Sequence, residues 1–222
     1  MTSTLARLAL ALLTVVSLAT AVRAELPLVL EETFESGADR WQPTDPASWK
    51  IVTTPRGKVY GLVADSKYNP PFRSPVNIAI LNDVVVADFQ LDVKLQSTVP
   101  DYGHRSLVLV FGYQDPAHFY YVHFGKKTDD HANQIFIVNG AARVKISTKT
   151  TPGTDWTDGW HRARITRSVS DGATKVYFDN LEEPVMIAED KTFAWGQIGL
   201  GAFDDLGNFD DLTLRGIEVK RP

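Results

Sequence analysis

The sequence contains no cysteine, and this absence excludes several kinds of structure and chemistry. Disulfide bonds, which stabilise many small exported domains, cannot form, so stability must come from a buried hydrophobic core or from a bound ion. A thiol nucleophile and a lipid attached to cysteine are excluded for the same reason. The sequence also lacks an apolar run of about 20 residues, the length of a membrane-spanning helix, and we therefore expect no membrane insertion.

The longest apolar run covers only residues 8–19, near the N-terminus. It follows Arg7 and precedes Val22-Arg23-Ala24, in which Val22 and Ala24 occupy the positions that a signal peptidase reads. This pattern predicts a cleaved signal peptide over residues 1–24 and a secreted or periplasmic protein. The remaining residues, 25–222, have the length of one domain, and no linker or repeat divides them.

Basic residues are outnumbered, with 23 Lys and Arg against 27 Asp and Glu, so the net charge is −4. Loss of the predicted signal peptide removes Arg7 and Arg23 and no acidic residue, which changes the net charge from −4 to −6. Proteins that bind nucleic acid or anionic membranes depend on basic surface for their affinity. We therefore expect neither as a partner.

Helical periodicity is missing as well. After residue 24, no stretch of about ten residues repeats apolar side chains with the 3.6-residue period of a helix. Residues 86–96 instead alternate, with Phe89, Leu91, Val93 and Leu95 on one face and polar side chains on the other. Many short strands without helices predict an all-β sandwich or barrel. Similar runs predict further strands at residues 50–53, 58–63, 76–81, 106–111, 119–124, 134–138, 144–147, 162–167, 175–179, 197–202 and 211–219.

Glycine, asparagine and proline mark the expected turns and loops. Asn139-Gly140 lies between two apolar runs and predicts a hairpin with a two-residue type I′ turn, whose central residues need positive φ. Leu206-Gly207-Asn208 predicts a turn before the last strand. The loop at residues 68–73 combines aromatic residues with two prolines. It has two interpretations, a stiff aromatic rim of a ligand site or a packed crossover between sheets.

Two segments resemble the concanavalin-A-like and laminin-G-like superfamily of jelly-roll domains. Residues 159–180 contain Gly-Trp-His, an alternating strand, a short turn and then Val-Tyr-Phe-Asp, which resembles a hairpin of this superfamily. Residues 196–212 resemble its closing strands, in which a glycine-rich strand leads to a Phe-Asp-Asp strand that pairs with the first strand, here near Glu32. The resemblance implies a two-sheet antiparallel jelly-roll sandwich, with Trp160 in the core and His161 in a structural role.

The resemblance does not imply one activity, because the superfamily includes lectins, carbohydrate-binding modules, glycoside hydrolases, polysaccharide lyases and adhesion domains. Its hydrolases usually carry two catalytic carboxylates in a Glu-x-Asp-x-x-Glu pattern, which is missing here. The sequence also has no Gly-x-Ser-x-Gly elbow, no phosphate-binding loop and no His-Glu-x-x-His zinc motif. These absences disfavour the corresponding classes of enzyme.

Polar and aromatic residues are densest between residues 104 and 145. On the strand near residues 118–124, alternation places Phe119, Tyr121 and His123 on one face. Such a face suits a saccharide, because aromatic rings contact sugar rings, polar side chains bond hydroxyls, and cations bind carboxylates or sulfates. With neighbouring strands included, the candidate ligand-binding residues are Arg105, Tyr121, His123, Gln134, Arg143 and Lys145.

Three functions remain open at this stage. The first is a secreted carbohydrate-recognition domain that binds an extracellular polysaccharide on its concave sheet. The second is a polysaccharide lyase or glycoside hydrolase that uses His123, Tyr121 and Arg105. In a lyase, Tyr121 or His123 would remove the proton beside a uronate, while Arg105 or Gln134 offsets the carboxylate charge. In the structural alternative, Tyr121 packs in a core and His123 is a hydrogen-bonded sheet residue.

The third function is an adhesion module that binds a protein through an apolar patch on the convex face.

Calcium is the ion that the resemblance suggests. Related jelly rolls often hold a structural calcium between the first strand and the last, through acidic side chains and backbone carbonyls. Glu32 and Asp211 match those places, with Asp210 as a substitute. The alternative is that the acidic residues near the last strand only solvate and shape a tight turn.

Overall fold

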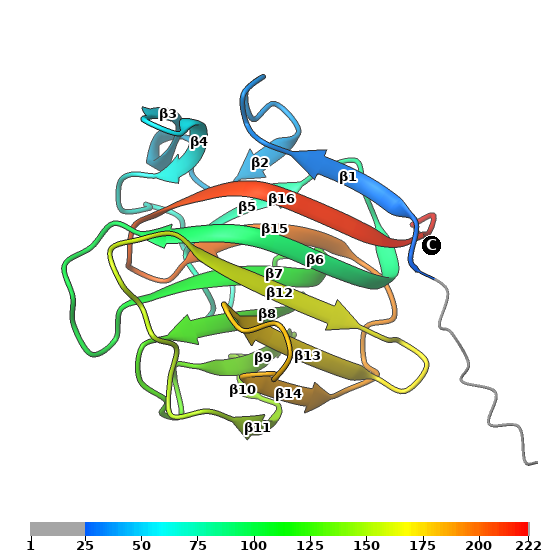
Figure 1. Cartoon of the computed structure of the whole chain (residues 1–222). Helices are drawn as coiled ribbons and strands as arrows, with labels where there is room; N and C mark the ends of the chain where they lie inside the picture. The colour runs from blue at the N-terminus through cyan, green and yellow to red at the C-terminus, as the bar shows by residue number, and fades with distance from the viewer. Residues whose placement is uncertain (1–24, 222) are drawn as a thin grey trace, which may run out of the picture.

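The computed structural model describes residues 25–221, so the predicted signal peptide lies outside the described residues. The described chain forms two antiparallel sheets packed as a sandwich, which confirms the predicted fold class (Figure 1). None of its elements is a helix long and apolar enough to cross a membrane.

One sheet has nine strands. Their order is β11 (Ser147–Thr150), β14 (Met186–Glu189), β13 (Ala173–Phe178), β12 (His161–Arg167), β6 (Val86–Ser97), β16 (Gly207–Glu218), β4 (Gly57–Leu62) and β3 (Trp49–Thr54), and β1 (Leu28–Glu32) also pairs with β16. The first strand therefore pairs with the last, as the resemblance implies, and Glu32 lies opposite Leu212.

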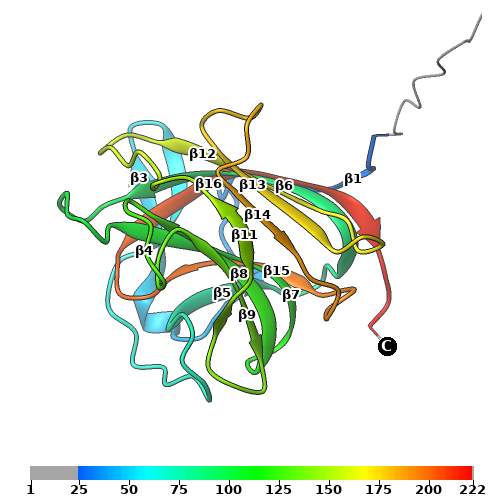
Figure 2. The same cartoon turned by 90° about the horizontal axis from the view of Figure 1, so that it is seen from below.

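The other sheet has seven strands, and Figure 2 shows the two sheets as stacked layers. Its order is β10 (Val144–Lys145), β9 (Gln134–Asn139), β8 (His118–Gly125), β7 (Ser106–Asp115), β15 (Gln197–Ala202), β5 (Asn77–Leu81) and β2 (Trp41–Pro43). A short 3-10 helix (Pro46–Ser48) precedes β3.

Alternation along the strands builds the core between the sheets. The four apolar residues predicted to share one face of β6, from Phe89 to Leu95, are all buried in this core. Tyr120, Val122 and Phe124 of β8 contribute to it from the facing sheet. The outward-facing Asp92 is nevertheless buried, because the side chains of Arg162 and Arg164 cover it and donate to its carboxylate.

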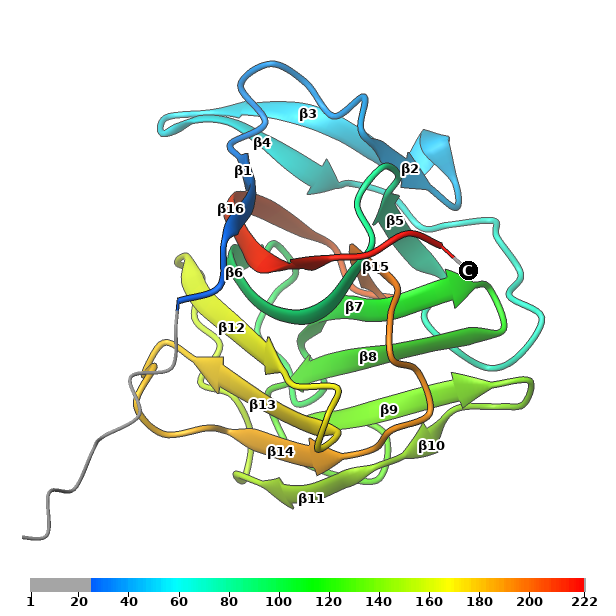
Figure 3. The same ribbon diagram turned by 90° about the vertical axis from the view of Figure 1, so that its right-hand side faces the viewer.

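The single strand predicted at residues 144–147 is wrong, because the chain changes sheets there. β10 pairs with β9 in the seven-stranded sheet, whereas β11 pairs with β14 in the nine-stranded sheet (Figure 3). The hairpin predicted at Asn139-Gly140 does join β9 to β10, but its turn is longer than two residues. Asn139 remains in the strand opposite His118, and only Gly140 of the pair has positive φ, at 64°.

The last strand also begins earlier than predicted. β16 starts at Gly207, so the chain turns over residues 203–206 instead of 206–208. A Cβ on Gly207 would lie 2.7 Å from the carbonyl oxygen of Gln96 and from the Leu107 side chain, so this glycine is required by packing. Trp160, predicted in the core, is only half-buried and lies under the guanidinium of Arg56, while Trp156 is buried instead.

Candidate functional site

Five of the six predicted ligand-binding residues lie on or beside the outer face of the seven-stranded sheet. The predicted alternation holds on β8, because Phe119 and Tyr121 belong to an apolar cluster on this outer face, separate from the core between the sheets. His123 follows Tyr121 on the same face and pairs with Gln134 of β9. Lys145 of β10 pairs with Phe136, a member of the outer cluster. Arg143 lies in the turn just before β10 and stacks on the Phe136 ring.

Aromatic rings and one arginine stack together on this face. The guanidinium carbon of Arg143 lies 4.7 Å from the ring centre of Phe136 and 4.4 Å from that of Phe203. Phe136 stacks on Tyr121 at 5.0 Å, and Phe203 stacks on His123 at 5.3 Å. Arg143 also donates from Nη1 to the Tyr121 hydroxyl at 2.9 Å. We call these five residues the aromatic–arginine cluster.

Most side chains of this cluster are buried, but the rings at the edge of the face are partly exposed to solvent. Tyr121 and Phe136 are buried, whereas Phe203 and Arg143 are half-buried, as are Phe72 and Tyr113, which pack against the outer cluster. Phe72 belongs to the loop at residues 68–73, which had two interpretations. The carbonyl of Arg73 in this loop accepts from the Arg143 backbone N–H, so the loop borders the candidate face. The half-buried rings and the exposed Arg73 therefore form the accessible layer of this face.

His123 is fixed by hydrogen bonds on both ring nitrogens. Its Nδ1 donates to the His131 carbonyl at 2.8 Å, and its Nε2 shares a hydrogen bond with the Ser106 hydroxyl at 2.9 Å. Burial lowers the pKa of His123 to about 4, and the nearby Arg143 guanidinium acts in the same direction. The imidazole is therefore neutral near pH 7.

Burial also raises the pKa of the Tyr121 hydroxyl, and the Arg143 guanidinium only partly offsets this shift. A phenol with a raised pKa is a poor base near neutral pH. The other two side chains of this set have partners of their own. Gln134 donates to the Asp129 carbonyl at 2.8 Å, and Lys145 donates to the Asp130 carboxylate at 2.6 Å.

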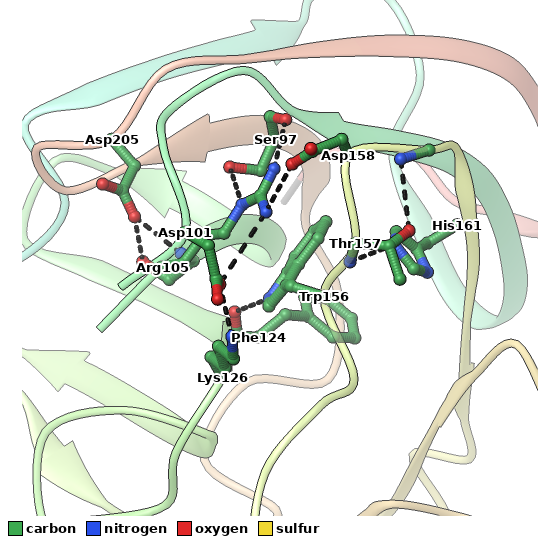
Figure 4. A network of polar contacts seen from close by, with 12 residues as sticks. Ser97, Asp101, Arg105, Phe124, Lys126, Trp156, Thr157, Asp158, His161 and Asp205 are labelled. Atoms are coloured by element: carbon green, nitrogen blue, oxygen red, sulfur yellow. Dashed lines mark hydrogen bonds and ion pairs between the residues drawn. The ribbon is translucent and has the colours of Figure 1, made fainter. Parts of the chain in front are cut away.

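Arg105 is the predicted site residue that the fold separates from the others. It directly precedes β7, and Figure 4 shows its guanidinium directed at Ser97 and Asp158. Its guanidinium donates to the Ser97 carbonyl at 2.9 Å and to the exposed Asp158 carboxylate at 3.0 Å. The side chain is only 1 % exposed, so its donors hold the chain together and do not reach the face that carries Tyr121.

Ser106, His123 and Asp205 have the residue types of a hydrolase triad but not its arrangement. In such a triad the carboxylate bonds the Nδ1 of histidine. Here Nδ1 faces a backbone carbonyl, and Asp205 accepts from the backbone N–H of Ser106 at 2.6 Å instead. Burial raises the pKa of the Asp205 carboxyl, and Ser106 is 1 % exposed. These contacts disfavour a serine nucleophile.

The residues predicted to hold calcium are engaged with other groups. Asp211 contacts Arg56 at 2.8 Å and Lys94 at 2.7 Å, and Asp210 contacts Arg56 at 3.2 Å. Glu32 accepts from the Phe34 backbone N–H. Among residues 25–221, no three His, Asp or Glu side chains lie close enough together to hold a metal ion. Calcium prefers six to eight oxygen ligands, and this ion-paired arrangement does not offer such a set.

Sequence reasoning missed Phe203 and Tyr113, which complete the candidate face. Phe203 lies in the turn after β15, and Tyr113 lies within the stretch from Phe111 to Asp115 in which the register between β7 and β8 shifts. A strand pattern alone does not indicate which ring from a turn folds back over a sheet. The aromatic side chain inside the Gly-Ala-Phe-Asp-Asp turn was the available signal.

Comparisons with known proteins support the fold. No family model matches the sequence, and no curated protein matches it. Among solved structures, carbohydrate binding module CBM66 from Bacillus subtilis has a TM-score of 0.57 at 18% identity over 80% of this chain and 96% of the module. A Bacillus subtilis protein of unknown function with a galectin-like fold has a TM-score of 0.60 at 12% identity over 89% and 99%. Domain 4 of AbnA, a GH43 extracellular arabinanase from Geobacillus stearothermophilus solved with arabinotriose, has a TM-score of 0.55 at 11% identity over 89% and 96%. At these identities the likeness concerns the fold alone.

Proposed function

We propose that this chain is an exported saccharide-binding domain, which binds a polysaccharide on the outer face of its seven-stranded sheet. The observation that carries the proposal is the aromatic–arginine cluster together with the half-buried rings of Phe203, Phe72 and Tyr113 on the same face. The similar folds of a carbohydrate binding module and of an arabinanase domain add support.

The cluster offers both kinds of contact that a sugar needs. Aromatic rings give large contact area at low cost in conformational entropy, and Phe203, Phe72 and Tyr113 present such area at the surface. Arg143 has five N–H donors, of which its side chain uses one, on Tyr121. The remaining donors are held rigidly by the stacked rings and suit hydroxyl or carboxylate oxygens.

Binding agrees better with these contacts than catalysis does. A general base has to reach the substrate proton and needs a pKa near the working pH. His123 is buried with both nitrogens engaged, and Arg105 lies away from Tyr121. The predicted catalytic set is therefore not assembled, and we propose recognition without chemical change of the saccharide.

The test is binding of the purified protein to a panel of neutral and acidic polysaccharides, measured by affinity electrophoresis and then by calorimetry with oligosaccharides. We expect Phe203→Ala to weaken binding at least about fivefold, which corresponds to a loss of roughly 1 kcal/mol from one well-packed contact. Ile217→Ala is the matched control, because Ile217 is an exposed apolar residue on the other sheet.

Three outcomes would contradict the proposal. If no saccharide of the panel binds, the result favours the alternative of an adhesion module that binds a protein. If the oligosaccharide is cleaved, the result favours the alternative of a polysaccharide lyase or glycoside hydrolase. If Phe203→Ala and Ile217→Ala bind as well as the unchanged protein, the saccharide site lies elsewhere.

A further inference from the structure

A groove of about 410 Å³ lies on the outer face of the nine-stranded sheet, away from the aromatic–arginine cluster. Most of its lining residues come from β13, β12, β6 and β16, which run side by side in Figure 1, and Glu25, Ser168 and Asp171 border it. The strand register places Lys175, Thr166, Gln90 and Arg215 directly beside one another in a single row. Because neighbouring strands lie about 4.8 Å apart, this row is about 14 Å long.

Several polar groups in the groove are unused. Within residues 25–221, the Lys175 ammonium, the Thr166 hydroxyl and the Tyr177 hydroxyl have no hydrogen-bond or ion-pair partner. Arg215 contacts the Leu26 carbonyl and the Glu25 carboxylate through Nη1 alone, which leaves its Nε and Nη2 donors available. The groove thus offers a cation at each end of the row and hydroxyl and amide groups between them.

Three acidic groups lie near these cations, namely Asp92, Glu25 and Asp171, of which Asp171 lines the groove and accepts from the Ala173 backbone N–H at 3.1 Å. Asp92, in the next row of the sheet, receives Arg162 and Arg164, each at 2.9 Å. Glu25 is at the surface, with 78% of its side chain exposed, and lies 3.4 Å from Arg215. An acidic ligand group can replace that exposed carboxylate at little cost, because surface ion pairs contribute only about 0–1 kcal/mol.

We propose that this groove is a second saccharide site, specific for an acidic oligosaccharide whose carboxylate or sulfate groups pair with Lys175 and Arg215. Thr166, Gln90 and the Tyr177 ring and hydroxyl contact the sugar between those charges. The inference takes the saccharide class from the proposed function but does not use its site. With one site on each sheet, the domain can hold two glycan chains at once.

The experiment is calorimetry of the purified protein with a galacturonate hexamer and with its methyl ester, which has the same rings without the charges. We expect Lys175→Gln to weaken binding of the acidic hexamer about tenfold and to leave binding of the ester unchanged, because a charged hydrogen bond is lost. The matched control is Lys149→Gln, which removes the same charge from an exposed position on β11. Amide chemical shifts during the titration are expected to change at Thr166 and Lys175.

The inference is overturned if Lys175→Gln binds the acidic hexamer as the unchanged protein does, or if Lys149→Gln loses as much. It also fails if the hexamer does not bind, or if the amide shifts change only on the seven-stranded sheet. Phe203→Ala separates the two proposals. Loss of acidic-hexamer binding only in Phe203→Ala supports the first site and rejects the second, whereas loss only in Lys175→Gln assigns the hexamer to the groove.

Discussion

Burial of His123 links one side chain to the stability of the whole domain. The imidazole stacks on Phe203 and is held between the His131 carbonyl and the Ser106 hydroxyl. Protonation would place a cation beside Arg143 in a buried region, so the native protein resists it. An unfolded chain has no such restriction, and its histidine takes up a proton with a pKa near 6.5.

The folded pKa of His123, about 4, lies below the unfolded value of 6.5, so the unfolded state binds more protons between these values. The free energy of unfolding should therefore fall as the pH decreases from 7 to 4.5, by about 2 kcal/mol from this residue. His123→Asn keeps an amide donor near the position of Nδ1 but cannot take up a proton. Urea denaturation across this pH range should give a shallower decrease for His123→Asn, and equal slopes for the two proteins would contradict the assignment.

Single residues show what the sequence was able to predict about the site. Alternation on β8 correctly placed Tyr121 and His123 on one face, because side chains of a strand follow a period of two. The same period does not report how much of that face is covered by turns, so the sequence left the burial of Tyr121 open as one of two alternatives, and the structure shows it buried. Arg105 precedes its strand, where no alternation fixes the direction of the side chain.

At the level of elements, β15 depends on its glycines. It lies between β5 and β7 in the seven-stranded sheet, and the resemblance had predicted a glycine-rich strand there. A Cβ on Gly201 would lie 2.2 Å from the carbonyl oxygen of Asn77 in the adjacent strand β5. That carbonyl belongs to the backbone and cannot turn away as a side chain can.

Gly201→Ala should therefore lower the free energy of unfolding by about 2 kcal/mol or more, through forced displacement of β5. Gly103→Ala is the control, because its Cβ would meet only the Lys127 side chain, at 3.7 Å. The urea concentration at the midpoint of unfolding reports the stability of each variant. If the two variants have the same midpoint, β5 and β15 are not packed as closely as described.

Boundaries between elements were harder to predict than the elements themselves. The apolar run at residues 144–147 contains the point at which the chain leaves one sheet and enters the other. A local pattern cannot distinguish one strand from two short ones, since partner strands decide it. β14 and β11 have short or polar sequences, MIAE and STKT, that give no strand signal alone. They pair with each other, and β14 also pairs with β13.

At the level of the whole molecule, the two sheets have different outer faces. The seven-stranded sheet carries a second apolar cluster, and the nine-stranded sheet carries a polar groove. The sequence predicted the sandwich because many short alternating runs without helices leave few other arrangements. It did not predict the order of strands, because β6 pairs with β12 and β16, both distant in sequence.

The first strand, β1, pairs with the last strand, β16, and the predicted calcium site lies where these two strands meet. The calcium prediction stays untested, and the contacts of its residues determine what to expect. Asp210 and Asp211 are already neutralised by Arg56 and Lys94, so calcium would have to displace two cations to bind there. A ligand present at a hundred times its Kd raises the free energy of unfolding by about 2.7 kcal/mol.

We therefore expect excess calcium, compared with a chelator, to leave the Tm of the purified protein unchanged in scanning calorimetry. A rise in Tm would contradict this expectation and favour the metal site suggested by the resemblance. Asp210→Asn then identifies the place, because a calcium site at Glu32, Asp210 and Asp211 loses a charged ligand in this variant and its rise in Tm disappears. A rise that persists in Asp210→Asn locates the ion elsewhere, so that Asp210 and Asp211 are paired with Arg56 and Lys94 rather than with a metal.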